Sequence, residues 1–369
     1  MGVTLSLTSL VYVILTLFFS VLSILGTLLI ILVYFMYVDL RTTSRKIVVF
    51  LSIGDFINAL SQTIGLVWYV SDTHTSVDYT DIKFLALCEG PAAGLIFGTI
   101  ASCLWTVVLA LYMYICIVRN RVGLAQKLIT PSHVVCWMIP SLMVIILMSE
   151  TELGYDEALK NSSSSASICW IRNVNDSNPK AVFDQFLWQV FSMPFWELTS
   201  VIVVAILTSR TVHHVHAEIL REKDQHDISE ETMAAIWAAN KKMVAIPVVM
   251  VFVRIWGIAR FLVTAITKMA YPGQKAILKR VDSHPAMVIL MMLQGIGDGS
   301  QGLGNAMLFC FFTKSVRTRL WDGIKRAVSC KWRHKRREKS TRSDHGSILA
   351  DDRQPVPAGT AKIESSVTV

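Results

Sequence analysis

Seven long apolar stretches follow one another along the chain, separated by polar segments. Each contains the roughly 20 mostly apolar residues that a helix needs to cross a bilayer. A soluble protein could not cover so many such segments, so the pattern predicts an all-α membrane protein, a bundle of seven transmembrane helices. The stretches run over Leu10–Val38, Ile47–Val70, Leu85–Val118, Leu128–Ser149, Gln185–Leu207, Met243–Ile266 and Pro285–Phe312.

Composition supports this interpretation. Of the 369 residues, 53% are hydrophobic and 17% are charged, and the mean hydropathy is +0.50, which is atypical of a soluble domain. No charged residue precedes Asp39, and the first apolar run exceeds the ~7–15 residues of a signal sequence. We therefore expect a short extracellular N-terminus over 1–9 and a membrane domain over 10–312.

The loop charges predict the orientation. With the N-terminus outside, the cytoplasmic segments carry 25 Lys and Arg and the outer segments carry 8, as the positive-inside rule requires. Both Asn-x-Ser/Thr glycosylation sequons, at Asn161 and Asn175, fall in the second outer loop. The sequence thus predicts a multi-pass plasma-membrane protein whose basic charge faces membrane lipids, and no nucleic-acid partner.

Three of the seven cysteines lie outside the apolar stretches or at their ends. Cys88 and Cys169 both fall on the oxidising side, where disulfides persist, and we expect a bond between them; the alternative is two free thiols. Cys330 lies on the inner side just after the last stretch, where palmitoylation is expected.

Several residue strings then resemble those of a receptor family. From Gln301 to Leu320 a Gln-Gly pair precedes an aromatic-Cys-Phe run and a charged segment. Leu104–Arg119 reads LWTVVLALYMYICIVR, the second outer loop contains Cys169-Trp-Ile, and Lys241-Lys-Met-Val-Ala-Ile-Pro247 opens the sixth stretch. Over residues 40–325 the chain resembles G-protein-coupled receptors of the secretin-like and cyclic-AMP-receptor-like branch, and within it the orphan receptor 157 group.

This resemblance implies a receptor that passes an extracellular signal to a heterotrimeric G protein. It favours the Gq class, with phosphoinositide and calcium output, and the ciliary membrane. Two departures separate the chain from rhodopsin-like receptors: Tyr112-Met-Tyr114 stands where an acidic-Arg-aromatic triplet ends the third helix, and the last stretch lacks Asn-Pro-x-x-Tyr. With about nine residues before the first stretch, we expect no hormone-binding domain and leave the ligand unknown.

Four ionisable residues lie deep within apolar stretches: Asp55, Glu197, Arg254 and Asp298. An intramembrane charge costs about 2.5–3.5 kcal/mol at the bilayer centre on insertion scales, so such residues face the bundle interior and pair. We expect Glu197 or Asp298 to pair with Arg254, and Asp55 to lie in a polar inner pocket. The pairing is either a switch or a static lock; as a switch, it would let the sixth helix pivot near Pro247 and Gly257.

Two other sequence patterns resemble binding motifs but do not predict the corresponding sites here. Gly297-Asp-Gly-Ser-Gln-Gly302 matches the dinucleotide fingerprint, but that motif must link a strand to a helix; inside an apolar stretch it indicates close helix packing or a kink. His213, His214 and His216 have no cysteine partners, so we expect a solvated helix face and no metal site. No catalytic constellation appears, so we expect neither an enzyme nor a cofactor.

The cytoplasmic side is suited to protein contacts. The third inner loop lacks Gly and Pro, which favours extension of the flanking helices. Beyond the last stretch an apolar residue recurs every four positions among basic ones, predicting an amphipathic membrane-surface helix over 313–330. Residues 331–369 are predicted to form a disordered tail, whose serines and threonines are candidate contacts for kinases and arrestin.

Other functional classes fit less well. A microbial-type retinal protein needs a lysine in the last helix, and Pro285–Phe312 has none. A seven-helix transporter or channel without G-protein coupling remains the alternative, although internal repeats typical of transporters are missing. The charge of a ligand stays open, because acidic outer loops face a basic segment, Lys275–Arg280.

Overall fold

The computed structural model describes residues 7–71, 88–150, 153–154, 169–171, 179–225, 230–271, 274–313, 316–323 and 325. The chain divides into two compact units, Met1–Val316 and Arg317–Val369, and the helix bundle belongs to the first. Residues 316–323 are helical. Cys330, most of the expected surface helix 313–330 beyond that turn, and the expected tail 331–369 lie outside the described residues.

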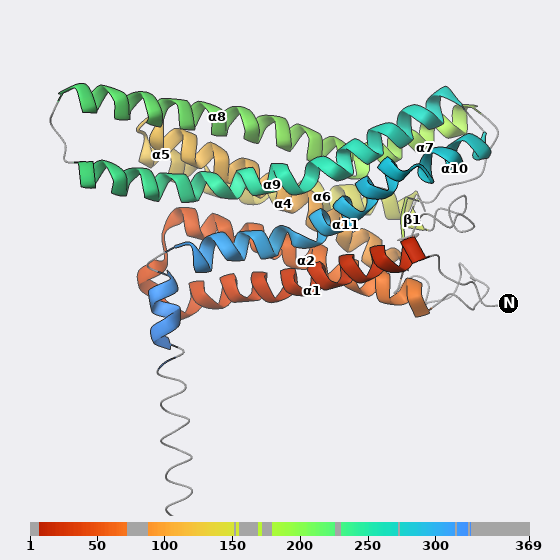
Figure 1. Ribbon diagram of the computed structural model, residues 1–369, viewed down its shortest axis with the longest axis horizontal. Coiled ribbons are helices and arrows are strands. Elements are labelled where there is room, and N and C mark those ends of the chain that lie inside the picture. The colour runs from red at the N-terminus through yellow and green to blue at the C-terminus, as the bar shows by residue number, and fades with distance from the viewer. Residues whose placement is uncertain are drawn as a thin grey trace, which may run out of the picture. The chain divides into compact units, whose positions relative to one another are not determined.

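Seven long helices form the bundle, as the apolar pattern predicted (Figure 1). Shorter elements join or extend them: η1 (Val38–Leu40), α5 (Val122–Lys127), α7 (Pro179–Ser192), α10 (Lys275–Asp282) and a π-helical turn, η3 (Met307–Phe311). Asn120, with φ of 49°, makes the left-handed turn between α4 and α5. The long helices are α1 (Leu7–Met36), α2 (Thr43–Ser71), α4 (Gly90–Ile117), α6 (Ile129–Ser149), α8 (Pro194–Gln225), α9 (Glu230–Ala270) and α11 (Pro285–Ala306).

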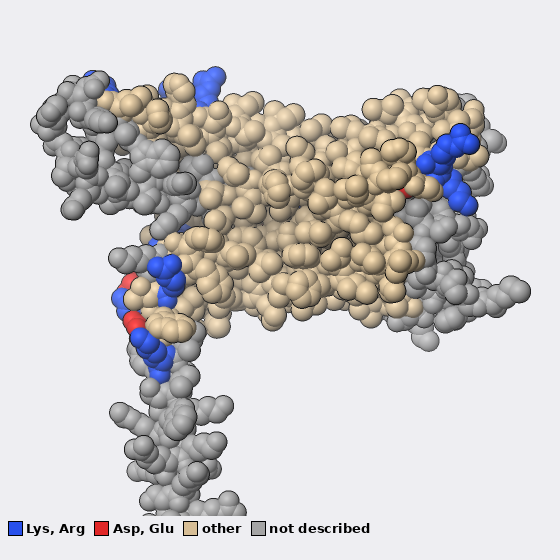
Figure 2. Space-filling model, viewed as in Figure 1, with Lys and Arg blue, Asp and Glu red and all other residues tan. Residues whose placement is uncertain are grey.

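Six described helices are long and apolar enough to cross a membrane; α11 is the long helix that falls short. Its 22 residues include five glycines and four polar residues on its inner side, which lowers its mean hydropathy. α11 packs against three other long helices, α1, α2 and α9, so its polar inner side lies against protein. Figure 2 shows a broad band without charged side chains on the visible face, with Lys and Arg gathered towards the helix ends.

Two helix boundaries differ from the apolar pattern. The expected fifth span, Gln185–Leu207, is broken at Met193 into α7 and α8, because Pro194 cannot donate a backbone hydrogen bond. At the other end, α8 continues to Gln225 and α9 begins at Glu230, so both helices extend well past their apolar stretches. The extension was expected from the lack of Gly and Pro.

α4 lies at the centre of the bundle, in contact with α2, α6, α8 and α9. α1 and α11 pack on each other, and α8 and α9 run side by side (Figure 1). Because α4 contacts four other long helices and α11 contacts three, polar side chains on these two helices can reach most of the bundle.

Glycines bring the helix backbones of the bundle close together. A Cβ atom at Gly98 on α4 would lie 2.6 Å from the backbone nitrogen of Asn58, and one at Gly54 on α2 would lie 2.9 Å from that of Ser102. A Cβ at Gly297 would meet the carbonyl oxygen of Val253 on α9. The glycines of the 297–302 motif therefore serve helix packing.

One end of the bundle is closed by a disulfide. Cys88, just before α4, is bonded to Cys169 with a Cα–Cα distance of 5.4 Å, which confirms the expected pairing. The next residues form strand β2 (Trp170–Ile171), which pairs antiparallel with β1 (Leu153–Gly154). Both cysteines are buried among apolar residues of α4, α6, α7 and α8. We call this the disulfide end, and the opposite end the α8–α9 loop end.

Candidate functional site

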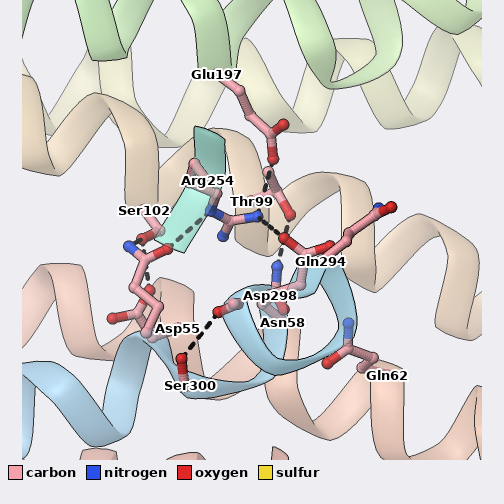
Figure 3. Close-up of polar contacts among 12 residues, drawn as sticks. Asp55, Asn58, Gln62, Thr99, Ser102, Glu197, Arg254, Gln294, Asp298 and Ser300 are labelled. Atoms are coloured by element: carbon pink, nitrogen blue, oxygen red, sulfur yellow. Dashed lines mark hydrogen bonds and ion pairs between the residues drawn. The ribbon is translucent and has the colours of Figure 1, made fainter. Parts of the chain in front are cut away.

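The four ionisable residues expected inside the membrane come from four helices: Asp55 from α2, Glu197 from α8, Arg254 from α9 and Asp298 from α11. Figure 3 shows Glu197, Arg254 and Asp298 pointing towards one another between their helices. The Arg254 side chain is only 3% exposed, whereas those of Glu197 and Asp298 are 12% and 19% exposed. The guanidinium is thus almost completely buried, whereas both carboxylates remain partly exposed.

Arg254 pairs with both carboxylates that were expected as alternative partners, Glu197 and Asp298. Its NH1 lies 2.8 Å from Oε1 of Glu197 and 3.4 Å from Oδ1 of Asp298. A buried guanidinium without a carboxylate would be very costly, so these contacts fix its position. The shorter distance makes Glu197 the stronger partner, and the pairing ties α8, α9 and α11 together.

Gln301 on α11 connects the Arg254 guanidinium to another helix by two hydrogen bonds. Its Oε1 accepts from Arg254 Nε at 2.9 Å, and its Nε2 donates to Ser102 Oγ at 2.7 Å. An amide has distinct donor and acceptor ends, so these two bonds define its orientation. Arg254 is thereby linked to α4 through one neutral side chain.

Asp55 lies at the other end of this relay and is only 3% exposed. Its Oδ1 accepts from Ser102 Oγ at 2.5 Å and its Oδ2 accepts from Asn305 Nδ2 at 2.7 Å. Both carboxylate oxygens thus bond neutral donors, and no ion pair described here joins Asp55 directly to Arg254. Asp55 is thus held by neutral side chains of α4 and α11, and the inner pocket expected around it stays a prediction.

Together these bonds form a chain through the bundle, which we call the polar network. It runs from Glu197 and Asp298 through Arg254, Gln301 and Ser102 to Asp55 and Asn305. Its members come from five helices, α2, α4, α8, α9 and α11. A displacement of any one of these helices therefore changes hydrogen bonds to at least one other.

Two further polar contacts continue along α2 towards the disulfide end. Asn58 Nδ2 donates to Thr99 Oγ1 at 2.5 Å, and Ser20 Oγ donates to Gln62 Oε1 at 2.6 Å. Asp55, Asn58 and Gln62 lie three and four residues apart, so one face of α2 carries all three. Figure 3 shows the three in a row along that helix.

A second arginine lies on the same side of α9. Arg260 NH1 donates to Gln294 Oε1 on α11 at 3.0 Å. Gln294, Asp298, Gln301 and Asn305 follow at intervals of four, three and four residues, so they form one polar stripe of α11. Arg254 and Arg260 each bind this stripe, about two helical turns apart.

We did not predict Ser102, Gln301, Asn305 or Gln294 as network members from the sequence. The stripe on α11 was detectable, because polar residues at helical spacing in an apolar segment indicate an inward face. Ser102 was not, since serines and threonines within such helices commonly bond their own backbone, as Ser52 and Thr106 do here.

The described contacts assign no role to the other expected site residues. Pro247 and Gly257, the expected hinge, lie within the continuous helix α9, and the atoms nearest to a Cβ at Gly257 would be those of Gln294, at ordinary contact distance. Asn161 and Asn175 lie outside the described residues. In the part of the chain that the structure describes, no three His, Cys, Asp or Glu side chains group as metal ligands.

The family model described as slime mold cyclic AMP receptor matches residues 3–283, which is most of the chain and includes six of the seven long helices. The chain belongs to this receptor family.

Curated relatives agree with the family. The chain is 28% identical to G-protein coupled receptor 157 of Mus musculus over 306 residues, covering 82% of each chain. It is 27% identical to the Homo sapiens protein of that name over 305 residues, covering 82% of this chain and 80% of the relative. This cyclic-AMP-receptor-like protein is therefore a multi-pass G-protein-coupled receptor, and its relatives are receptors and not enzymes.

Proposed function

We propose that this receptor resides in the plasma membrane with its N-terminus outside and activates a G protein of the Gq class, with phosphoinositide and calcium output. The Lys and Arg bias of the loops supports this orientation. So does the Cys88–Cys169 disulfide, because it requires an oxidising side. Kinases and arrestin acting at the tail, and the ciliary membrane as the compartment, belong to the same proposal.

The polar network is the observation that carries the mechanism. Arg254 holds α9 to α8 and α11 by charge-assisted bonds, while Glu197 and Asp298 remain partly open. An extracellular ligand that changes these contacts would favour a second arrangement of α9, because a ligand shifts a two-state equilibrium only through differential affinity. α9 would then pivot near Pro247 and Gly257 and open the α8–α9 loop end to a Gα subunit.

Substitution of Arg254 tests the switch against the static lock. Arg254→Met removes both ion pairs and keeps an unbranched side chain, so we expect basal G-protein activation to change at equal surface expression. Arg254→Lys keeps the positive charge, so its basal G-protein activation should lie between those of wild type and Arg254→Met. If Arg254→Met leaves basal and stimulated signalling unaltered, the network is a static lock and this mechanism is wrong.

The G-protein class needs a separate measurement. Dissociation of each Gα class from Gβγ, recorded in cells that express the receptor without added ligand, reads out coupling directly. We expect the Gq sensor to respond above empty-vector cells. A response confined to another class would correct the Gq assignment, and silence of every sensor with the surface receptor present would overturn basal coupling to Gq.

A further inference from the structure

Two arginines of α9 meet α11 on either side of a glycine. Arg254 contacts Asp298, and Arg260 contacts Gln294, one turn away from Asp298 on the same helix. Between the two arginines, a Cβ at Gly257 would lie 3.4 Å from Cγ of Gln294 and 3.5 Å from its amide nitrogen. Because glycine carries no side chain, Gln294 lies directly against α9 at this point.

Asp298 is held loosely by Arg254. Its Oδ1 lies 3.4 Å from the NH1 atom that Glu197 contacts at 2.8 Å, whereas N–H···O hydrogen bonds are usually about 2.7–3.2 Å long. The Asp298 side chain is also the most exposed of the three, at 19%. Arg254 therefore keeps its stronger partner, Glu197, when Asp298 moves away.

Arg260 already acts on the same carboxylate. The direct partner of its guanidinium is neutral, since NH1 donates to Oε1 of Gln294 at 3.0 Å. The charge of Arg260 nevertheless acts on Asp298, and the Gln294 side chain makes a hydrogen-bond contact with that carboxylate. Arg260 and Asp298 both act on the hydroxyl of Tyr12 on α1 as well. Gln294 thus stands between the carboxylate and a second arginine.

A transfer of Asp298 from Arg254 to Arg260 would keep the charges balanced. Removing a carboxylate outright from a buried arginine is strongly destabilising, because an uncompensated charge is left behind. In the transfer, Glu197 stays with the first arginine and the second gains a carboxylate, while the displaced Gln294 amide is neutral. The two positions are one helical turn apart, about 6 Å along the axis. Two arrangements of similar free energy are what a ligand-controlled equilibrium requires.

We propose that Asp298 exchanges between Arg254 and Arg260, and that Gln294 controls the exchange because its amide must first leave Arg260. This inference rests on the proposed function, since the arrangement with Asp298 on Arg260 is assigned to the signalling state. In that arrangement α9 loses a bond to α11 at Arg254 and gains one nearer the disulfide end. The part of α9 towards the α8–α9 loop end is thereby released, as the pivot of α9 requires.

The test is thermal unfolding of the full-length purified receptor in one detergent. The quantity compared is the loss in midpoint that Asp298→Asn causes in different backgrounds. In Gln294→Met the competing amide is gone, so Asp298 should move to Arg260 and the loss should be about twofold larger than in wild type. Adding Arg260→Gln to Gln294→Met returns Asp298 to Arg254, so the loss should fall back to its wild-type size.

Further variants separate the exchange from a structural role of Gln294. Gln126→Met, at an exposed position of α5, is the control and should leave the loss at its wild-type size. Gln294→Leu serves if Gln294→Met does not fold. Gln294→Glu places a fixed carboxylate at Arg260 and so keeps Asp298 on Arg254. At equal surface expression, basal G-protein activation should therefore rise in Gln294→Met and fall in Gln294→Glu.

The remaining outcomes overturn the inference. An equal loss in wild type and Gln294→Met would show that Asp298 does not transfer, and a larger loss that persists with Arg260→Gln would exclude Arg260 as its second partner. Because unfolding is measured without a G protein, these failures leave the coupling proposal standing. An exchange seen by unfolding in a receptor whose variants activate no Gα would instead overturn the coupling proposal alone. Equal basal activation in Gln294→Met and Gln294→Glu would overturn the assignment of the exchanged arrangement to signalling.

Discussion

Arg254 and Gln301 are joined by a hydrogen bond of 2.9 Å between Nε and Oε1, and this bond connects the ion pairs to the remainder of the polar network. The amide nitrogen of Gln301 is thereby turned to Ser102, whose hydroxyl in turn donates to Asp55. A guanidinium on α9 and a carboxylate on α2 are therefore linked without touching. Loss of the single amide should uncouple them.

We therefore expect Gln301→Leu to destabilise the receptor. The substitution leaves the Arg254 Nε–H without its acceptor in a buried site, which costs about 1–3 kcal/mol, and thermal unfolding in one fixed detergent should show a lower midpoint. Gln126→Leu, at an exposed position of α5, is the control and should have little effect. An unchanged midpoint for Gln301→Leu would show that the relay contributes nothing to stability.

The close approach of α2 and α4 gives a second prediction. In Gly98→Ala the added Cβ would lie 2.6 Å from the Asn58 backbone nitrogen, and backbone atoms cannot turn aside as a flexible side chain can. The helices must separate, which weakens the Asp55–Ser102 and Asn58–Thr99 bonds. We expect a loss of about 1–3 kcal/mol, typical of overpacking, and reduced surface expression.

Gly123→Ala is the matched control for this substitution. Gly123 lies in α5, and nothing is within 4 Å of the position its Cβ would take. Alanine is better than glycine within a helix by about 0.5–1 kcal/mol, so this variant should be as stable as wild type or more so. Equal behaviour of the two alanine variants would contradict the packing argument.

The sequence alone predicted those features of the receptor that follow from the free energy of transferring residues from water into the bilayer. Apolar runs predict helices because the bilayer requires them, and the charges of Glu197, Arg254 and Asp298 predict mutual contact because isolation is costly. The ends of α8 and α9 were less predictable, since Gln225 and Glu230 lie in polar sequence where the bilayer sets no limit. The length of each helix there depends on local propensity.

The network member on α4, Ser102, could not be predicted for a different reason. Ser102 can satisfy its hydroxyl within its own helix, so its sequence position does not indicate a bond to Asp55. That bond requires α2 and α4 to approach closely at Gly54 and Gly98. Which glycines face one another is decided by the packing of all seven helices.

The outer disulfide gives a prediction about non-additivity. Cys88→Ala and Cys169→Ala should each lower surface expression, because loss of a native disulfide costs about 2–5 kcal/mol in small secreted domains. The double variant should be no worse than either single one, since both remove the same bond. Cys116→Ala, which removes a free thiol, is the control. Additive losses would contradict a shared bond.

The two carboxylates that share Arg254 should contribute unequally. Glu197 lies 2.8 Å from NH1 and Asp298 lies 3.4 Å from it, so the Glu197 bond is the better formed. We expect Glu197→Gln to cost about 1–3 kcal/mol, as for hydrogen bonds to charged groups, and Asp298→Asn to cost less. Asp184→Asn, at an exposed position of α7, is the charge-matched control and should be neutral.

Combining the two carboxylate substitutions tests whether they act through Arg254. In the double variant the guanidinium has lost both anions and is left buried, so the destabilisation should exceed the sum of the single effects. Contacting residues in one network show coupling energies of about 0.5–3 kcal/mol, which thermal unfolding resolves. Strict additivity would mean that Glu197 and Asp298 do not share the arginine, and an Asp298→Asn variant less stable than Glu197→Gln would reverse the assigned order.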